Sequence, residues 1–266
     1  MSSQELFVRD PREVPFLNEQ VQKILALAQN SSHCIPVSEE DDFGFMAINF
    51  LYKQIQHAES VLLLVPRHDS GLVARTMIEG FYQLLWAFQE PQERGKLWRS
   101  FSIIRDWRLI QERLKEGIPV DASDIRTNEA CLKEFGSLHR LKKPKQNSAD
   151  QYNRTWRGGV SLSDMAEVVG RELYDIPYSE LSDWEHWGVS GIGDSISRVN
   201  EQIITDANSE RVAGLSLLAA FQSLFQMLEI VNVHLSLNIT EALEELLKEF
   251  MDTMSSYREQ MAHPKF

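Results

Sequence analysis

The stretch LVARTMIEGFYQLLWAF, which runs from Leu72 to Phe88, decides the fold. It is apolar on almost every side of a helix, yet it carries Arg75 and Glu79 four residues apart. With 3.6 residues per turn, this pair shares a face with large aromatic side chains, so we expect the pair to be mostly buried. An exposed pair at this spacing contributes only about 0.2–0.5 kcal/mol, whereas removing one partner of a buried pair costs roughly 3–5 kcal/mol. The pair therefore predicts either an internal strut or a functional site.

Helical periodicity dominates the rest of the chain, and no run of alternating strands is present apart from one extended candidate, Ser195–Ile204. The fold class that follows is all-α, an irregular multi-helix bundle with antiparallel core helices. Pro66 predicts a tight turn between two of the core helices. The expected helices are Phe16–Gln29, Glu39–Leu64, Asp69–Gln89, Gln92–Lys115, Ser123–Leu141, Leu162–Val169, Tyr178–Val189, Glu210–Leu237 and Glu241–Ala262. The residues expected to start helices are Ser38, Asp121, Ser161 and Thr240 as caps and Pro91 in a first turn.

The expected domain organisation is an N-terminal helix and linker over 1–37 and a helical bundle domain over 38–266. Within the bundle domain, 142–160 is a basic loop and 240–266 is an acidic C-terminal helix.

The composition limits the classes of partner. Lys and Arg number 27 against 39 Asp and Glu, and the net charge of -12 disfavours general binding to nucleic acid or to an anionic membrane. Cys34 and Cys131 have no metal-ligand spacing and are expected to be reduced thiols. No signal peptide or membrane span is indicated, so a cytosolic location is expected.

A cluster of basic residues lies in and around the loop Lys142–Val160. Two aromatic residues, Tyr152 and Trp156, lie among these cations. Two interpretations stay open, a solvated loop and a local contact with nucleic acid through stacking and phosphate binding. The basic residues are Arg140, Lys142, Lys143, Lys145, Arg154 and Arg157.

A second polar group lies on the expected helix Tyr178–Val189, where Ser179, Ser182, His186 and Ser190 follow one another at helical spacing. Such a group either allows a neighbouring helix to approach closely or lines a recess. Asp183 and His186 form only one unit of the carboxylate–histidine pattern that bridged metal sites use twice, so no metal or other cofactor is expected.

Taken in order, these motifs resemble a bacterial helical family, the domain of unknown function family 5677. The residues that carry the resemblance are Arg75-Thr-Met-Ile-Glu79, Trp156-Arg-Gly-Gly, Tyr174, Tyr178, Leu181-Ser182 and His186. The similarity spans about Ala58 to Leu237. It implies an all-α fold and no established reaction, and it implies that the two polar groups belong to one site.

The favoured hypothesis is a cytosolic bacterial module, with a defence or stress-response role, that binds a protein partner or a small anionic ligand. Its expected ligand-binding residues are Arg75, Glu79, Trp156, Tyr178, Ser182 and His186. The alternative is a metal-independent helical ribonuclease in which Arg75, Glu79 and His186 are the catalytic candidates. A third hypothesis makes the pair a buried strut in a protein-interaction module. Self-association is compatible with all three, and a local nucleic-acid contact would use Lys142, Lys143, Lys145, Arg154 and Arg157.

Overall fold

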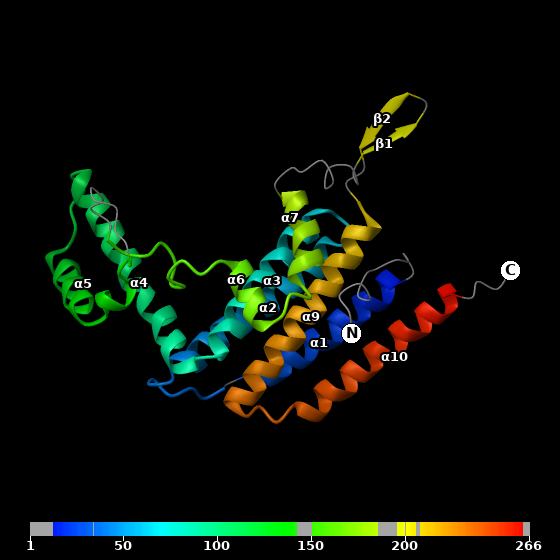
Figure 1. Cartoon of the computed structure of the whole chain (residues 1–266), viewed down its shortest axis with the longest axis horizontal. Helices are drawn as coiled ribbons and strands as arrows, with labels where there is room; N and C mark the ends of the chain where they lie inside the picture. The colour runs from blue at the N-terminus through cyan, green and yellow to red at the C-terminus, as the bar shows by residue number, and fades with distance from the viewer. Residues whose placement is uncertain are drawn as a thin grey trace.

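The computed structural model describes residues 13–33, 35–142, 151–185, 196–199, 201–205 and 208–262. Over these residues the chain is almost entirely helical, with one two-stranded hairpin (Figure 1), so the all-α prediction is confirmed. The helices are α1 (Glu13–Ser31), α2 (Asp42–Leu64), α3 (Asp69–Phe88), α4 (Pro91–Lys115), α5 (Ala122–Phe135), the 3₁₀ helix η2 (Gly136–His139), α6 (Leu162–Val169), the π-helical turn η3 (Tyr174–Tyr178), α7 (Ser179–Glu185), α9 (Glu210–Leu235) and α10 (Thr240–Ala262). Strand β1 (Ile196–Val199) pairs antiparallel with β2 (Gln202–Thr205).

Helix α9 forms the centre of the core, with α1, α2 and α3 packed against it (Figure 1). It is apolar on nearly all sides because neighbours surround it, and Ser209 caps its first turn by accepting from the Val212 amide. Its length and composition would also suit a membrane span, but 83% of its most apolar window is buried inside the molecule. Helix α10 lies along α1 and closes one side of the core.

Helices α2 and α3 form the antiparallel pair that Pro66 predicts. The Gln54 side chain crosses between them and donates from Nε2 to the Met77 carbonyl at 2.7 Å. Helix α4 then crosses the start of α2 at close range. A Cβ on Gly95 would lie 2.6 Å from the backbone nitrogen of Phe43, so only glycine fits at this crossing.

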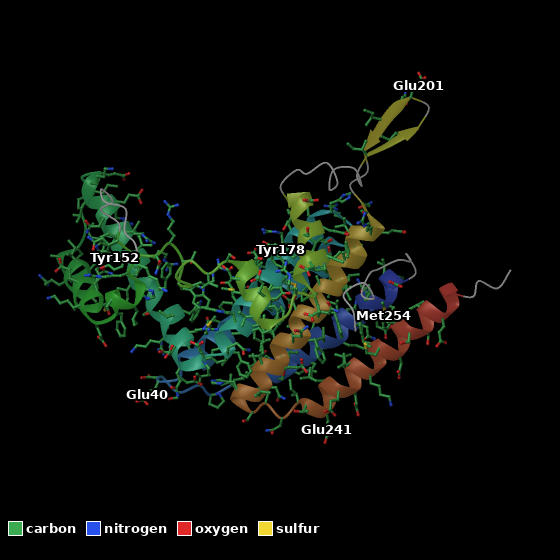
Figure 2. All side chains as sticks on the ribbon, viewed as in Figure 1. Glu40, Tyr152, Tyr178, Glu201, Glu241 and Met254 are labelled. Carbon is green, nitrogen blue, oxygen red and sulfur yellow. The ribbon has the colours of Figure 1, made fainter. Side chains whose placement is uncertain are left out.

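The second half of α4, together with α5 and η2, forms an arm that projects from the body (Figures 1 and 2). Buried His139 of η2 ties the arm to α4 through a 2.9 Å hydrogen bond between Nε2 and the Ser100 hydroxyl. Tyr152 packs edge-on against Trp107, and Arg108 donates to the Tyr152 carbonyl. The segment after residue 150 is therefore fixed to the arm.

Most element boundaries follow the sequence-based expectation, with three corrections. Asp41 caps α2 by accepting from the Gly44 amide, whereas Ser38, the expected cap, accepts from Glu40 in the preceding turn. Thr240 is the first residue of α10, and its hydroxyl accepts from Asn232 instead of capping. The α5 helix ends at Phe135 and tightens into η2, so it is shorter than expected. Asp121, Ser161 and Pro91 start their helices as expected.

Candidate functional site

Four of the sequence-predicted site residues meet in one hydrogen-bonded cluster between α3 and α7. Arg75 donates from Nε to the Ser182 hydroxyl at 2.8 Å and from Nη2 to the Tyr178 hydroxyl at 2.9 Å. Its Nη1 lies 3.0 Å from Oε1 of Glu79. The Tyr178 hydroxyl in turn donates to the same Glu79 oxygen at 3.0 Å. The residues Arg75, Glu79, Tyr178 and Ser182 are called the polar cluster below.

The polar cluster is partly shielded from water, since the Arg75 side chain is 15% exposed and that of Glu79 is 32% exposed. Burial, together with the neighbouring Glu79 carboxylate, raises the pKa of Tyr178. The phenol is therefore protonated at neutral pH and remains a donor to Glu79. All three guanidinium nitrogens of Arg75 bind side chains of this cluster, so Arg75 acts as a strut between two helices.

The backbone of η3 places Tyr178 over α3. Pro177 lies within this π-helical turn, which leads directly into α7. The Tyr178 ring stacks on that of Tyr174 with centroids 5.2 Å apart, and Tyr174 packs edge-on against buried Tyr82 of α3. The Arg75 guanidinium carbon lies 4.8 Å from the centroid of the Tyr178 ring, which adds a cation–π contact.

Trp156 packs against α3 one to two helical turns beyond Glu79. It is buried against Trp86, and its indole nitrogen donates to Oε1 of Gln83 at 3.2 Å. Its neighbour Arg157 is half-buried, and burial lowers the pKa of its guanidinium while the nearby Glu79 acts in the opposite direction. The structure thus places Arg157 toward the polar cluster.

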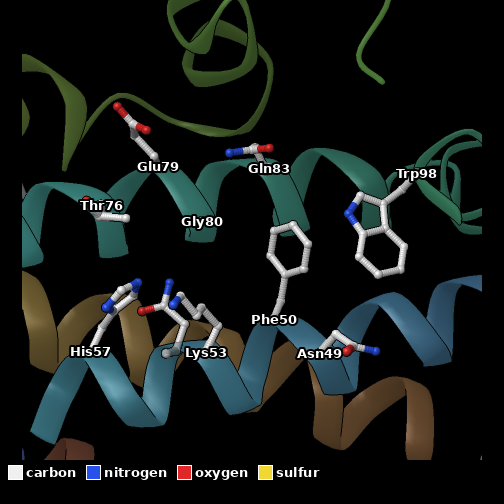
Figure 3. Close-up of a pocket in the computed structure, with 10 residues that line it drawn as sticks. Asn49, Phe50, Lys53, His57, Thr76, Glu79, Gly80, Gln83 and Trp98 are labelled. Atoms are coloured by element: carbon white, nitrogen blue, oxygen red, sulfur yellow. The ribbon is translucent and has the colours of Figure 1, made fainter. Parts of the chain in front are cut away.

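A groove of about 350 Å³ lies between α2 and α3, on the opposite side of Glu79 from α7. Figure 3 shows Phe50, Lys53 and His57 rising from α2 toward α3, while the Glu79 carboxylate points away from α2. Trp98 of α4 closes one end of the groove, and Gly80, which has no side chain, leaves room on α3 for the Gln54 amide. The lining residues are Asn49, Phe50, Lys53, Gln54, His57, Thr76, Glu79, Gly80, Gln83 and Trp98, and they define the α2–α3 groove.

Two polar atoms of the α2–α3 groove are buried without a hydrogen-bond partner in the part of the chain that the structure describes. They are Oε1 of Gln54, a side chain that is only 2% exposed, and Nε2 of His57. Burial, and to a lesser degree the charge of Lys53, lowers the pKa of His57, so its imidazole is neutral at neutral pH. Leaving such groups unpaired costs about 1–3 kcal/mol each. Both atoms lie beneath the groove surface, so a ligand could pair with them only if the two side chains reoriented.

Several predicted residues are not part of this arrangement. His186 and Ser190 lie outside the described residues, as do Lys143 and Lys145, so the expected contact between His186 and Glu79 stays a prediction. Ser179 is described but makes no side-chain hydrogen bond with the polar cluster. Lys142, Arg140 and Arg154 are exposed on the arm side of the loop. Among the described residues, no group of three or more His, Cys, Asp and Glu side chains could hold a metal ion.

Residues 44–203 match the model of a family of unknown function, DUF5677. The chain belongs to this family. The match begins near the start of α2 and ends in β2, so it contains both the polar cluster and the α2–α3 groove of this DUF5677 protein. It also shows that α9 lies beyond the family segment, which ends earlier than the sequence resemblance suggested. No curated protein and no solved structure matches the chain.

Sequence reasoning missed the groove residues on α2, namely Lys53, Gln54 and His57. A signal was present in hindsight, because Gly80 breaks the run of large side chains on α3 and faces the Gln54 amide. A Cβ at this position would lie 2.8 Å from Nε2 of Gln54. The sequence contains this glycine, but only the packing of the two helices shows what lies opposite it.

Proposed function

We propose that this protein is a binding module that holds a small, planar, anionic ligand in the α2–α3 groove. The observation that carries the proposal is the lining of the groove, which combines the rings of Phe50 and Trp98 with the exposed ammonium of Lys53. The volume, about 350 Å³, falls within the roughly 300–1,000 Å³ of small-molecule sites.

Each part of the ligand has a counterpart in the groove. Phe50 and Trp98 pack edge-on with centroids 5.8 Å apart and offer apolar ring surfaces to a planar body. The half-buried imidazole of His57 is neutral and can donate or accept one hydrogen bond. Lys53 is exposed and makes no ion pair within the described residues, so its ammonium supplies the positive charge for an anionic group.

The polar cluster has a supporting role in this proposal. It joins α3 to α7 next to the groove, and a rigid α3 keeps the groove open. The engagement of Arg75 by three side chains supports binding over phosphodiester cleavage, because a catalytic arginine would have to leave them to reach a phosphate.

A fluorescence titration with 8-anilinonaphthalene-1-sulfonate, an aromatic anion, tests the proposal. The native protein should bind this probe at a saturable site, and Lys53→Glu should weaken the binding about tenfold because the reversed charge repels the sulfonate. Lys248→Glu is the matched control, since Lys248 is also exposed but lies on α10, away from the groove. Thermal melts of all three proteins establish that the probe reports on folded protein.

Equal binding by the Lys53→Glu and Lys248→Glu variants would show that the probe does not use the groove. Absence of saturable binding to the native protein would also contradict the proposal.

A further inference from the structure

A second pocket of about 430 Å³ lies on the other side of Trp98, between the start of α2, the middle of α4 and the segment that carries Trp156. Its lining residues are Phe45, Trp98, Arg99, Phe101, Ser102, Arg105 and Trp156, and they define the α4 pocket. Four of these residues are aromatic and two are arginines, and none is acidic. This composition is unusual for a protein with a net charge of -12.

The aromatic surfaces of the α4 pocket are held in place by packing. Trp98 packs against Phe45 with centroids 6.0 Å apart, and Trp156 is fixed by its contact with Trp86 and its hydrogen bond to Gln83. Phe45 is 43% exposed although it is a large apolar residue. An exposed aromatic ring beside a fixed indole is a surface on which a nucleobase can stack.

The two arginines differ in what they bind. Arg99 lies 4.8 Å from the centroid of the Phe45 ring, and its Nη1 donates to the Glu39 carbonyl and to Asp42. Arg99 therefore forms part of the pocket wall, and Asp42 largely neutralises its charge. Arg105 is exposed and has no hydrogen bond or ion pair within the described part of the chain. Arg105 is thus available to bind a phosphate.

We propose that the α4 pocket binds a nucleotide, with its base stacked on the aromatic side chains and its phosphate bound by Arg105. This site is separate from the α2–α3 groove, and it does not depend on the function proposed for that groove. The exposed cations of the neighbouring loop stems, Arg140, Lys142 and Arg154, lie on the same arm and would extend the contact along a strand. The chemistry of base plus phosphate is shared by a free nucleotide and by a single-stranded nucleic acid.

Binding measurements with three probes test this proposal. 5′-AMP and a ten-nucleotide single-stranded RNA should each quench tryptophan fluorescence saturably, and ribose 5-phosphate should bind at least tenfold more weakly than AMP because it lacks a base. If the strand binds more tightly than AMP, with an affinity that falls as salt rises, the ligand is a single strand. Equal affinities for AMP and the strand identify a free nucleotide.

Variants on α4 assign the binding to the pocket. Arg105→Gln should weaken the binding of AMP and RNA roughly five- to tenfold and lower the salt slope for RNA by about one. Arg113→Gln is the matched control, because the Arg113 side chain is also exposed on α4 and makes no hydrogen bond or ion pair within the described residues, but it does not line the pocket. Ser102→Asp should also weaken binding, because it places a carboxylate in the pocket that repels the phosphate.

The proposal is overturned if neither AMP nor RNA binds, or if ribose 5-phosphate binds as well as AMP. An equal loss of affinity in Arg105→Gln and Arg113→Gln would also overturn it, because the binding would then reflect the general charge of α4. Because all three substituted positions, 102, 105 and 113, carry exposed serine or arginine side chains, thermal melts should show each variant folded.

Discussion

Removing the Glu79 carboxylate while keeping Arg75 tests whether the polar cluster supports the fold. Glu79→Ala removes two hydrogen bonds, one from Arg75 and one from the Tyr178 hydroxyl. Hydrogen bonds to charged groups contribute about 1.5–3 kcal/mol each, and the 32% exposure of Glu79 lets water replace part of this. We therefore expect the free energy of unfolding to fall by about 2–3 kcal/mol, less than the roughly 3–5 kcal/mol that breaking a fully buried ion pair costs.

The double variant Arg75→Met/Glu79→Met removes both charges and keeps apolar volume on α3. It should lower the free energy of unfolding by only about 1–2 kcal/mol, because no guanidinium remains without its carboxylate. Urea unfolding followed by circular dichroism measures both values. Glu19→Ala is the control, since it removes one partner of an exposed pair and should cost less than about 0.5 kcal/mol. If Glu79→Ala unfolds like the wild-type protein, the strut interpretation is refuted.

Two further substitutions test the packing of the arm on the body. Gly95→Ala should lower the free energy of unfolding by roughly 1–3 kcal/mol in urea titrations, because the new methyl group would overlap the Phe43 backbone. If Gly95→Ala is as stable as the control Ser102→Ala on the same helix, this expectation is wrong. Burial lowers the pKa of His139, so the unfolded chain takes up a proton there more readily than the folded protein does. The contribution of His139 to the free energy of unfolding should be complete above the unfolded pKa of about 6.5 and should decrease as the pH falls below it. In thermal melts between pH 7.5 and 5, the melting temperature of His139→Leu should therefore fall less than that of the wild type. An unchanged pH dependence in that variant would show that His139 does not contribute.

The sequence predicted the fold class and most helices because their causes are local. The apolar period, the capping carboxylate of Asp121 and the position of Pro91 each act within one or two turns. The boundary at Ser38 was wrong for an equally local reason. Two candidate caps lie three residues apart, and Asp41 binds the first-turn amide while Ser38 closes the turn before it.

The polar cluster was predictable in part. The partial burial of Arg75 and Glu79 follows from their position in an apolar helix, although Glu79 is more exposed than expected, and the family resemblance linked them to Tyr178 and Ser182. The identity of each hydrogen bond depends on the π-helical turn η3, which places Tyr178 and which no period in the sequence specifies. The two pockets were not predicted, because each is formed by residues far apart in the chain that share only Trp98.

Native mass spectrometry of the protein purified from its own host tests the ligand in the α2–α3 groove most directly. We expect the wild-type protein and Lys248→Glu to carry an additional small-molecule mass that Lys53→Glu has lost. A wild-type protein that carries no such mass, or a mass that Lys53→Glu retains in full, would contradict the account.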